Sequence, residues 1–224
     1  MEFDSFVLAA ATDDLSQSVT GEYADAVEFR IDLADEPLEQ LSEYDGGLPI
    51  IATNRVEWEG GEASDTPDRL EALRTATEHP RVEAIDVELS AVAAGDGLAV
   101  IEDARDRDVS VIVSTHDFEE TPSGPEMQRL LSRAGEYGDV GKLAVTASTL
   151  DDVLQLLAVT RARTQTGQQV ATMAMGAVGR HSRAVAPLYG SRIGYAPVDP
   201  DHATAPGQYD LETLRRLIEQ LKAE

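Results

Sequence analysis

Short β-rich runs alternate with amphipathic helical segments about eight times along this 224-residue chain, and this repetition limits the fold more than any other feature. The β-rich runs occupy residues 6–12, 26–33, 48–55, 84–90, 109–118, 141–147, 169–176 and 191–198. Several are nearly continuous apolar runs, which is typical of parallel strands buried on both faces. Helical segments lie at 66–79, 124–138, 150–165 and 210–224. Because no Pro- or Gly-rich linker and no change in composition interrupts the series, we predict an α/β fold, a single-domain (β/α)8 TIM barrel over residues 1–224.

The main alternative is an open, doubly wound sheet. Its hallmark is a Gly-rich, phosphate-binding turn between the first strand and the first helix. The corresponding segment here, AAATDDLSQS at 9–18, carries two acidic residues instead.

The sequence also indicates where two helices begin. Thr66 stands before Pro67, and Asp210 stands two residues before Glu212.

The net charge of −24 restricts the partners of this protein. An acidic surface of this size repels nucleic acid and anionic membranes, so binding to either is not expected. The 42 acidic residues are interleaved with periodic apolar segments, which indicates a folded core under an acidic coat rather than a disordered tail. We favour adaptation to high salt over the alternative of a GC-rich genome that replaces lysine by arginine, because unscreened charge of this density repels itself.

Targeting signals and cysteine chemistry are both missing from the sequence. The chain contains no cysteine, which excludes disulfides, thiolate metal sites and cysteine nucleophiles. No apolar run approaches the ~18 residues of a membrane span, and the N-terminus has no basic region typical of a secretory signal. We therefore expect a cytoplasmic protein.

Polar side chains gather at the C-terminal ends of the predicted strands, where barrels build their active sites. They are Glu28, Arg30, Arg55, Glu59, Glu88, His116 and Lys142, joined by Met173 and Met175. Side chains two apart on a strand share a face, as Glu28 and Arg30 do. Each residue also has a structural interpretation: a Glu-x-Arg pair serves as an ion pair, the methionines fill the core, and a single histidine stabilises the fold. His79, His181 and His202 receive no assignment.

Lys142 is the most informative of these residues. Only one other lysine, Lys222, occurs among the 18 basic residues. Lys142 stands within the apolar run at 141–147, where an inward lysine must either pair with a carboxylate or lose its proton. A deprotonated lysine is the nucleophile that forms Schiff bases with carbonyl substrates.

Seven short segments resemble segments of the type I 3-dehydroquinate dehydratase family, and they occur in the same order as in that family. They are EFRID at 28–32, ATNRVEWEGG at 52–61, STHDFEETP at 114–122, GKLAV at 141–145, MAMGAVGRHSR at 173–183, YGSRIGYA at 189–196 and ATAPGQYD at 203–210. The resemblance implies dehydration of 3-dehydroquinate to 3-dehydroshikimate without metal or cofactor. It also implies a homodimer.

The same resemblance implies a role for each site residue. Lys142 forms the imine with the substrate ketone, His116 is the general base and then the general acid, and Glu59 orients and tunes His116. Arg183 binds the substrate carboxylate through paired donors. The remaining substrate-binding residues are Glu28, Arg30, Arg55, Thr204, Gln208, Met173, Met175 and Tyr195. Arg30, Arg55 and Arg183 are expected to make a positive pocket within the negative field of the protein.

Some features depart from the family pattern, and two other functions stay open. Thr204 stands where a serine is usual, Gly194 where a threonine is common, and Arg192 is unexpected on a barrel strand. Residues 1–5 leave little to close the lower end of the barrel. One alternative function is a class I aldolase, which would share Lys142 but cleave a C–C bond. The other is a non-catalytic acidic binding protein that uses the barrel as a scaffold.

Overall fold

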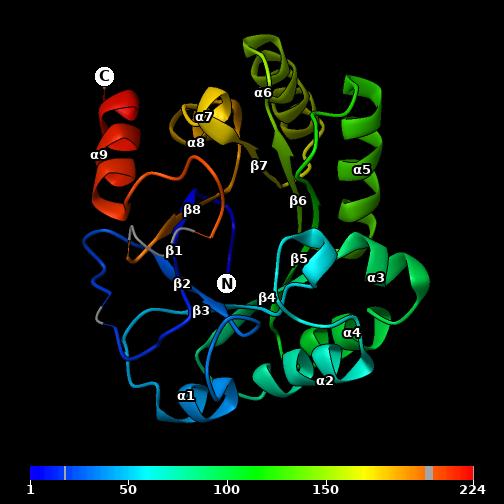
Figure 1. Cartoon of the computed structure of the whole chain (residues 1–224), viewed down its shortest axis with the longest axis vertical. Coiled ribbons are helices and arrows are strands. Elements are labelled where there is room, and N and C mark those ends of the chain that lie inside the picture. Colours follow the sequence, from blue (N-terminus) through cyan, green and yellow to red (C-terminus); the bar gives the residue numbers. More distant parts are fainter. Residues whose placement is uncertain (18, 200–203, 224) are drawn as a thin grey trace.

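The protein is a nearly closed barrel of parallel strands surrounded by helices, as a computed structural model describes it for residues 1–17, 19–199 and 204–223 (Figure 1). The strands are β1 Val7–Thr12, β2 Ala26–Arg30, β3 Ile50–Thr53, β4 Val82–Glu88, β5 Ser110–Asp117, β6 Val140–Thr146, β7 Val170–Met175 and β8 Ile193–Pro197. The helices are α1 Pro37–Glu43, α2 Pro67–Ala76, α3 Leu89–Ala94, α4 Leu98–Asp106, α5 Gly124–Tyr137, α6 Leu150–Gln165, α7 Gly176–Gly179, α8 Ser182–Val185 and α9 Leu211–Lys222, with 3₁₀ turns η1 Glu57–Glu59 and η2 Ala186–Tyr189. The predicted (β/α)8 barrel is therefore confirmed, and the open sheet is wrong.

The eight strands pair in the order β7-β6-β5-β4-β3-β2-β1-β8. Parallel ladders join every neighbouring pair in that order, with one register shift in the β3–β4 ladder. Within the described residues, the two outermost strands have no such ladder between them: β7 meets the residues just before β8 through a bridge from Val170 to Ser191, a 2.7 Å hydrogen bond from Arg192 N to Val170 O and a 3.0 Å hydrogen bond from Thr172 N to Ser191 Oγ. The seam between β7 and β8 is thus the weakest junction of the ring.

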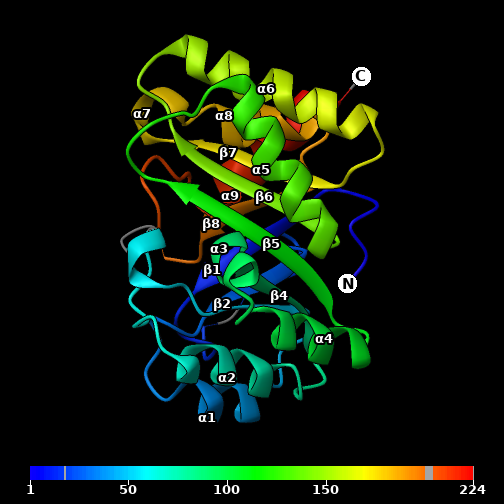
Figure 2. The ribbon, with the colours of Figure 1, turned by 90° about the vertical axis from the view of Figure 1, so that its right-hand side faces the viewer.

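Apolar side chains fill both the inside of the barrel and the layer between strands and helices. Inward residues such as Ile51, Ala84 and Ile112 form the interior cluster. Outward residues such as Leu143 and Val145 pack against α5 and α6, which cover this side of the barrel (Figure 2). Burial of alternate residues on both faces explains why the strands read as continuous apolar runs.

The first residues close the lower end of the barrel, so the expectation that little is available to do so is wrong. Phe3 is 2% exposed and belongs to the interior cluster. The Met1 ammonium donates to Glu83 O at 3.1 Å, and Ser110 Oγ donates to Met1 O at 2.6 Å. Figure 1 shows the N-terminus near the centre of the ring of strands. The short N-terminal segment thus places a buried aromatic side chain in the barrel interior.

The connection between β1 and β2 departs from the alternation of strands and helices. Its described residues, 13–17 and 19–25, contain no helix. Asp14 instead makes a local turn, in which its Oδ1 accepts from Ser16 N at 2.9 Å and Thr12 Oγ1 donates to Asp14 O at 3.1 Å. Short polar side chains that bond to nearby backbone compete with helix formation.

The two helix starts read from the sequence are confirmed. Thr66 is the N-cap residue of α2 with Pro67 in the first turn, and Asp210 caps α9 by accepting from Thr213 N at 2.9 Å. No helix within the described residues has the length and apolarity that crossing a membrane requires. The cytoplasmic location and the homodimer stay predictions.

Candidate active site

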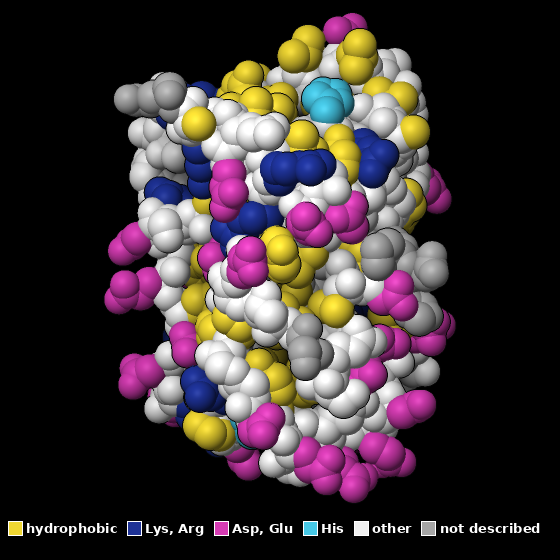
Figure 3. All heavy atoms as spheres, turned by 90° about the vertical axis from the view of Figure 1, so that its left-hand side faces the viewer, with side chains coloured by type: hydrophobic (Ala, Val, Ile, Leu, Met, Phe, Trp, Pro, Cys, Tyr) yellow, Lys and Arg dark blue, Asp and Glu magenta, His cyan; other side chains and the backbone are white. Residues whose placement is uncertain are grey.

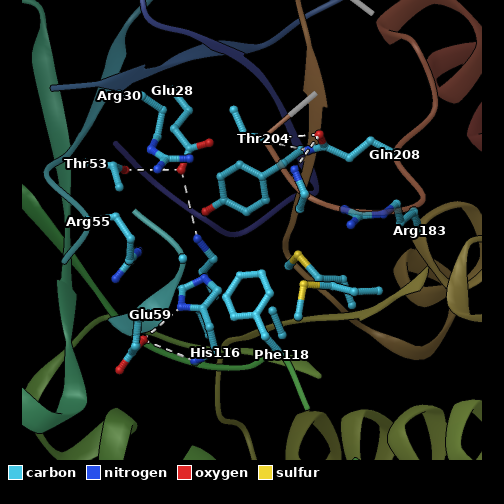
Figure 4. A pocket seen from close by; sticks show the side chains of 17 residues that line it. Glu28, Arg30, Thr53, Arg55, Glu59, His116, Phe118, Arg183, Thr204 and Gln208 are labelled. Atoms are coloured by element: carbon cyan, nitrogen blue, oxygen red, sulfur yellow. Dashed lines mark hydrogen bonds and ion pairs between the residues drawn. The ribbon is translucent and has the colours of Figure 1, made fainter. Parts of the chain in front are cut away.

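A cavity opens at the C-terminal ends of the strands, with about 480 Å³ of space when the solvent at its mouth is included (Figure 4). Its lining residues are Glu28, Arg30, Thr53, Arg55, Glu59, Gly60, His116, Phe118, Lys142, Ala144, Met173, Met175, Arg183, Tyr195, Thr204, Ala205 and Gln208. Every residue given a catalytic or substrate-binding role from the sequence is among them, whereas Glu88 is not. The cavity has the mixture of apolar walls and polar groups of a small-molecule site.

Lys142 lies at the floor of the cavity. On β6 it pairs with Ser114 of β5, and its side chain points inward while Leu143 points outward. Lys142 is 5% exposed. Its Nζ lies 2.8 Å from Asp86 Oδ2, 3.9 Å from Glu28 Oε1 and 4.3 Å from the centre of the Tyr195 ring. Two carboxylates and an aromatic face thus hold the amine in one position.

Asp86 lies behind the cavity lining, where it contacts Lys142 and Arg55, and the sequence reasoning did not single it out. Its Oδ1 lies 2.7 Å from Arg55 Nη2 and accepts from Ser114 Oγ at 2.6 Å. Burial opposes ionisation of Asp86, but Arg55 and Lys142 together hold its pKa far below the usual range. A signal was available, because Asp86 stands two residues before Glu88 and shares its face of the strand.

Glu88 extends this network behind the cavity. Its Oε1 lies 3.0 Å from Arg55 Nη1, and its Oε2 lies 2.8 Å from Arg69 Nη1. Arg69 also donates to Asn54 O at 3.0 Å. Each buried charge here has an opposite partner, which is the condition under which charged groups are tolerated in a core. Glu88 is therefore a support for Arg55 rather than a lining residue.

His116 and Glu59 form a second buried pair. His116 Nδ1 lies 2.9 Å from Glu59 Oε2, which also accepts from the His116 backbone N at 3.1 Å (Figure 4). Burial, together with Arg55 and Lys142, lowers the pKa of His116 well below its usual value. Burial also raises the pKa of Glu59 to about 7, against the opposing effect of Arg55. The imidazole is therefore neutral near pH 7, and its Nε2 is the nitrogen left for a ligand.

A tight backbone turn lets Phe118 reach over this pair. Gly60 follows Glu59 with φ +79°, and a Cβ there would lie 2.2 Å from Phe118 Cζ. The Phe118 ring stacks on His116 with centroids 6.3 Å apart and planes inclined by 20°. Only glycine fits at position 60 while Phe118 closes this wall.

The three arginines that line the cavity differ in how well they are neutralised. Arg30 binds Asp32 through Nε at 2.9 Å and Nη2 at 2.5 Å. Arg55 is matched by carboxylates as described. Arg183 is 4% exposed; it donates through Nη2 to Pro206 O at 3.3 Å, while its Nε has no hydrogen-bond partner among the described residues. Burial lowers the pKa of Arg183 to about 10. The expected positive pocket thus rests mainly on Arg183.

The loop after β8 supplies the remaining polar groups. Gln208 Nε2 donates to Thr204 Oγ1 at 3.3 Å, and Gln208 Oε1 accepts from Ala205 N at 3.2 Å. Thr204 and Gln208 therefore lie side by side at the rim of the cavity (Figure 4). Met173 and Met175 of β7 are buried and supply an apolar wall.

Two of the histidines left unassigned, His79 and His181, are not among the residues that line this cavity. His79 follows α2 and accepts from Arg81 N at 3.2 Å, His181 precedes α8, and His202 falls outside the described residues. Arg192 precedes β8 and donates to Asp4 O below the barrel. Within residues 1–17, 19–199 and 204–223, no group of three or more His, Asp or Glu side chains is arranged to hold a metal ion.

This chain is similar to known proteins over nearly its whole length. The 3-dehydroquinate dehydratase of Haloarcula marismortui is 60% identical over 228 residues, covering 100% of both chains. That of Haloquadratum walsbyi is 52% identical, covering 99% of this chain and 94% of the relative. The crystal structure of the type I enzyme from Clostridium difficile is 26% identical, has a TM-score of 0.87, and aligns over 97% of this chain and 92% of its own.

The relatives from salt-loving archaea confirm the salt-adapted origin read from composition. The sequence profile described as type I 3-dehydroquinase matches residues 7–224, which is nearly the whole chain. The chain therefore belongs to the type I 3-dehydroquinase family.

Proposed function

We propose that this enzyme removes water from 3-dehydroquinate through an imine between the substrate ketone and Lys142, with His116 as general base and general acid. The observation that carries the proposal is the cavity in which a buried lysine amine and a neutral imidazole are both positioned by carboxylates. Family membership supports the overall reaction. The roles of individual side chains are those that the family resemblance implies, and the geometry of the cavity supports them.

Imine formation activates the substrate carbon next to the ketone. The protonated C=N bond accepts electron density from that carbon, so its proton becomes easier to remove. His116 is neutral and can accept this proton through Nε2, because Glu59 holds Nδ1. The electron pair then forms a C=C bond as the neighbouring C–O bond breaks, and His116 returns the proton to the departing hydroxyl. Water finally releases the product from Lys142.

The substrate carboxylate is assigned to Arg183. This guanidinium is buried and retains an unpaired Nε, whereas Arg30 and Arg55 already meet carboxylates of the protein. A carboxylate bound by two donors of one guanidinium is held in a fixed orientation. Glu28, Arg30 and Gln208 are then placed to bind the ring hydroxyls, with Met173 and Met175 against the carbon skeleton.

Borohydride trapping tests the imine. During turnover, borohydride should reduce the C=N bond and leave a permanent mass on the peptide that contains Lys142. Lys142→Arg should lose both the label and the activity, because it keeps the charge but removes the nucleophile. His116→Ala should still be labelled while turnover falls by roughly 10²- to 10⁴-fold, the usual contribution of a general acid–base group.

Lys222 provides the internal control, because it is the only other lysine and lies exposed on α9, outside the cavity. Labelling of Lys222 instead of Lys142, or dehydration by Lys142→Arg at the parent rate, would disprove the mechanism. Assays with 3-dehydroquinate, followed by ultraviolet absorbance of the enone product, separate a dehydratase from an aldolase. Absence of any product would favour a binding protein.

A further inference from the structure

A buried polar atom without a hydrogen-bond partner in the protein can mark a position where a ligand supplies that partner. Among the described residues there are four such side-chain atoms: Nε of Arg69, Arg183 and Arg192, and the hydroxyl of Tyr195. Two of these residues, Arg183 and Tyr195, line the cavity. Arg183 is already assigned to the substrate carboxylate. The Tyr195 hydroxyl has no role in the mechanism described so far.

Tyr195 is held rigidly beside the proposed nucleophile. It lies on β8, is 4% exposed and belongs to the cluster of side chains that fills the barrel. Its ring centre lies 4.3 Å from Lys142 Nζ. Because the ring is packed in the barrel interior with Lys142 Nζ over it, the hydroxyl is held in place on the same cavity wall as the amine.

The hydroxyl is also a donor with no acceptor of its own. The carboxylates nearest to it electrostatically are Glu28 and Asp86, which add to burial in raising the pKa of Tyr195 well above its usual value. Both carboxylates have other donors: Thr53 Oγ1 reaches Glu28 at 3.1 Å, and Lys142 Nζ reaches Asp86 at 2.8 Å. A phenol that stays protonated and unpaired in a cavity is suited to bind an oxygen of the ligand.

We infer that the Tyr195 hydroxyl is a catalytic group that donates a hydrogen bond to the ketone oxygen while Lys142 attacks the ketone carbon. This inference rests on the imine mechanism proposed above. As the N–C bond forms, one electron pair of the C=O bond moves onto oxygen. A donor already positioned beside Nζ stabilises that charge without having to reorganise.

The protons and atoms of this step balance without any further reagent. The ammonium form of Lys142 and the ketone give the protonated imine and one water molecule, so two of the three ammonium protons leave with the ketone oxygen. His116 first accepts one proton from the ammonium, which frees the electron pair of nitrogen for attack, and passes that proton to the ketone oxygen. It then carries a second proton from nitrogen to the same oxygen, which leaves as water. Tyr195 keeps its own proton throughout and acts only as a hydrogen-bond donor.

Tyr195→Phe tests this role because it removes the hydroxyl and keeps the ring over Lys142. Rapid mixing with 3-dehydroquinate followed by borohydride measures how fast the lysine adduct forms, and we expect this rate to fall roughly 10²-fold, as on loss of one oxyanion donor. Substrate deuterated next to the ketone adds a second readout. Its isotope effect on turnover should shrink toward unity in Tyr195→Phe, because imine formation then limits the rate.

Tyr44→Phe is the matched control, since it removes a hydroxyl that donates to Leu48 O at 3.0 Å, outside the cavity. It should not change the rate of adduct formation. The thermal midpoint of Tyr195→Phe should equal or exceed that of the parent, because an unpaired buried hydroxyl is lost. An adduct rate or an isotope effect equal to the parent's in Tyr195→Phe would overturn the role of Tyr195 alone. Absence of adduct in the parent enzyme would overturn the imine mechanism itself.

Discussion

A buried charged side chain is available to bind a ligand only where no oppositely charged group of the protein already pairs with it. Arg30 and Arg55 are occupied by carboxylates of the protein, and Lys142 rests between Asp86 and Glu28. A buried charge without a partner is costly, so these pairs keep the empty site stable. Arg183 is the exception, because no ion pair neutralises its unpaired Nε edge within the described part of the chain. On the proposed function, the substrate carboxylate supplies the missing partner.

The raised pKa of Glu59 predicts a pH dependence of activity. Its carboxyl is ionised above about pH 7 and protonated below. Only the ionised form accepts fully from a neutral His116 through Nδ1, so kcat/KM should fall as the pH drops through this value. Glu59→Gln should flatten this acidic limb and lower the plateau by less than the roughly 10²- to 10⁴-fold that a complete acid–base group contributes. Glu57→Gln, an exposed change in the same turn η1, is the control and should leave the profile intact.

The same pKa fixes the sign of the effect of Glu59 on stability. A carboxyl whose pKa is raised in the folded state contributes fully below its ordinary value of 4.5, and that contribution is lost as the pH rises through about 7. The free energy of unfolding of the parent should therefore decrease relative to that of Glu59→Gln over this interval. For the activity prediction, a Glu59→Gln enzyme whose kcat/KM still falls at acidic pH as in the parent would show that another group causes that fall.

At this scale, sequence patterns located most of the site but not its internal pairing. Lys142 and His116 were identified by residue type and family strings, and both line the cavity. Asp86 was missed because it lies mid-strand, away from the C-terminal strand end where Glu88 attracted attention. The neutralisation of Arg30 by Asp32 depends on side-chain direction across a turn, which residue type alone does not determine.

The eighth strand shows how packing between elements accounts for the unusual residues read from the sequence. Gly194 faces outward, where a Cβ would lie 2.7 Å from Phe6 Cζ. Phe6 in turn lies beneath the end of α9, with Lys222 Nζ 4.9 Å from its ring centre. The usual threonine is absent at Gly194 because the ring of Phe6 occupies its space. Arg192 contacts the N-terminal segment through Asp4 O.

Gly194→Thr should therefore destabilise the fold by about 1–3 kcal/mol, the usual cost of overpacking. Thermal or chemical unfolding measures this change. Phe6→Ala combined with Gly194→Thr should cost less than the sum of the two single changes, because the small residue makes room for the threonine. Gly47→Thr is the control, since a Cβ at that exposed position has no neighbour within 4 Å. Strict additivity of the two changes would show that Phe6 does not exclude threonine.

Element prediction succeeded where periodicity is long and failed where segments are short. The helix expected at 150–165 coincides with α6, and each expected strand overlaps one of the eight observed. The four-residue helices α7 and α8 went unrecognised, because a single turn carries no periodic signal. The connection from β1 to β2 was expected to follow the alternation, but local bonds of Asp14 replace a helix there.

At the scale of the molecule, almost all of the net charge lies on the surface. Among the described residues, the buried charged side chains comprise five cations and four carboxylates, which nearly cancel. The net charge of −24 is thus carried by exposed groups, and Figure 3 shows acidic side chains crowded over the lower part of one face. The relatives from Haloarcula and Haloquadratum fit this composition.

We expect the unfolding midpoint and the turnover to rise between dilute buffer and molar KCl. Salt shortens the Debye length from about 10 Å at 0.1 M to about 3 Å at 1 M, which relieves repulsion among surface carboxylates. A neutral osmolyte at equal osmolality is the control and should give a smaller increase, because it does not screen charge. A midpoint that stays constant or falls in KCl would contradict the prediction.

Because the seam between β7 and β8 is the weakest junction of the ring, a bound substrate can stabilise the barrel as well as react in it. On the proposed function, Arg183 and Gln208 bind one substrate molecule, and these residues follow β7 and β8 respectively. The substrate then connects β7 and β8, the neighbouring strands between which the described residues form no ladder. Because it contacts residues that follow both strands, its binding stabilises the closed barrel relative to one opened at this seam. A change that weakens the β7–β8 seam should therefore lower substrate affinity, and bound substrate should protect β8 from local unfolding.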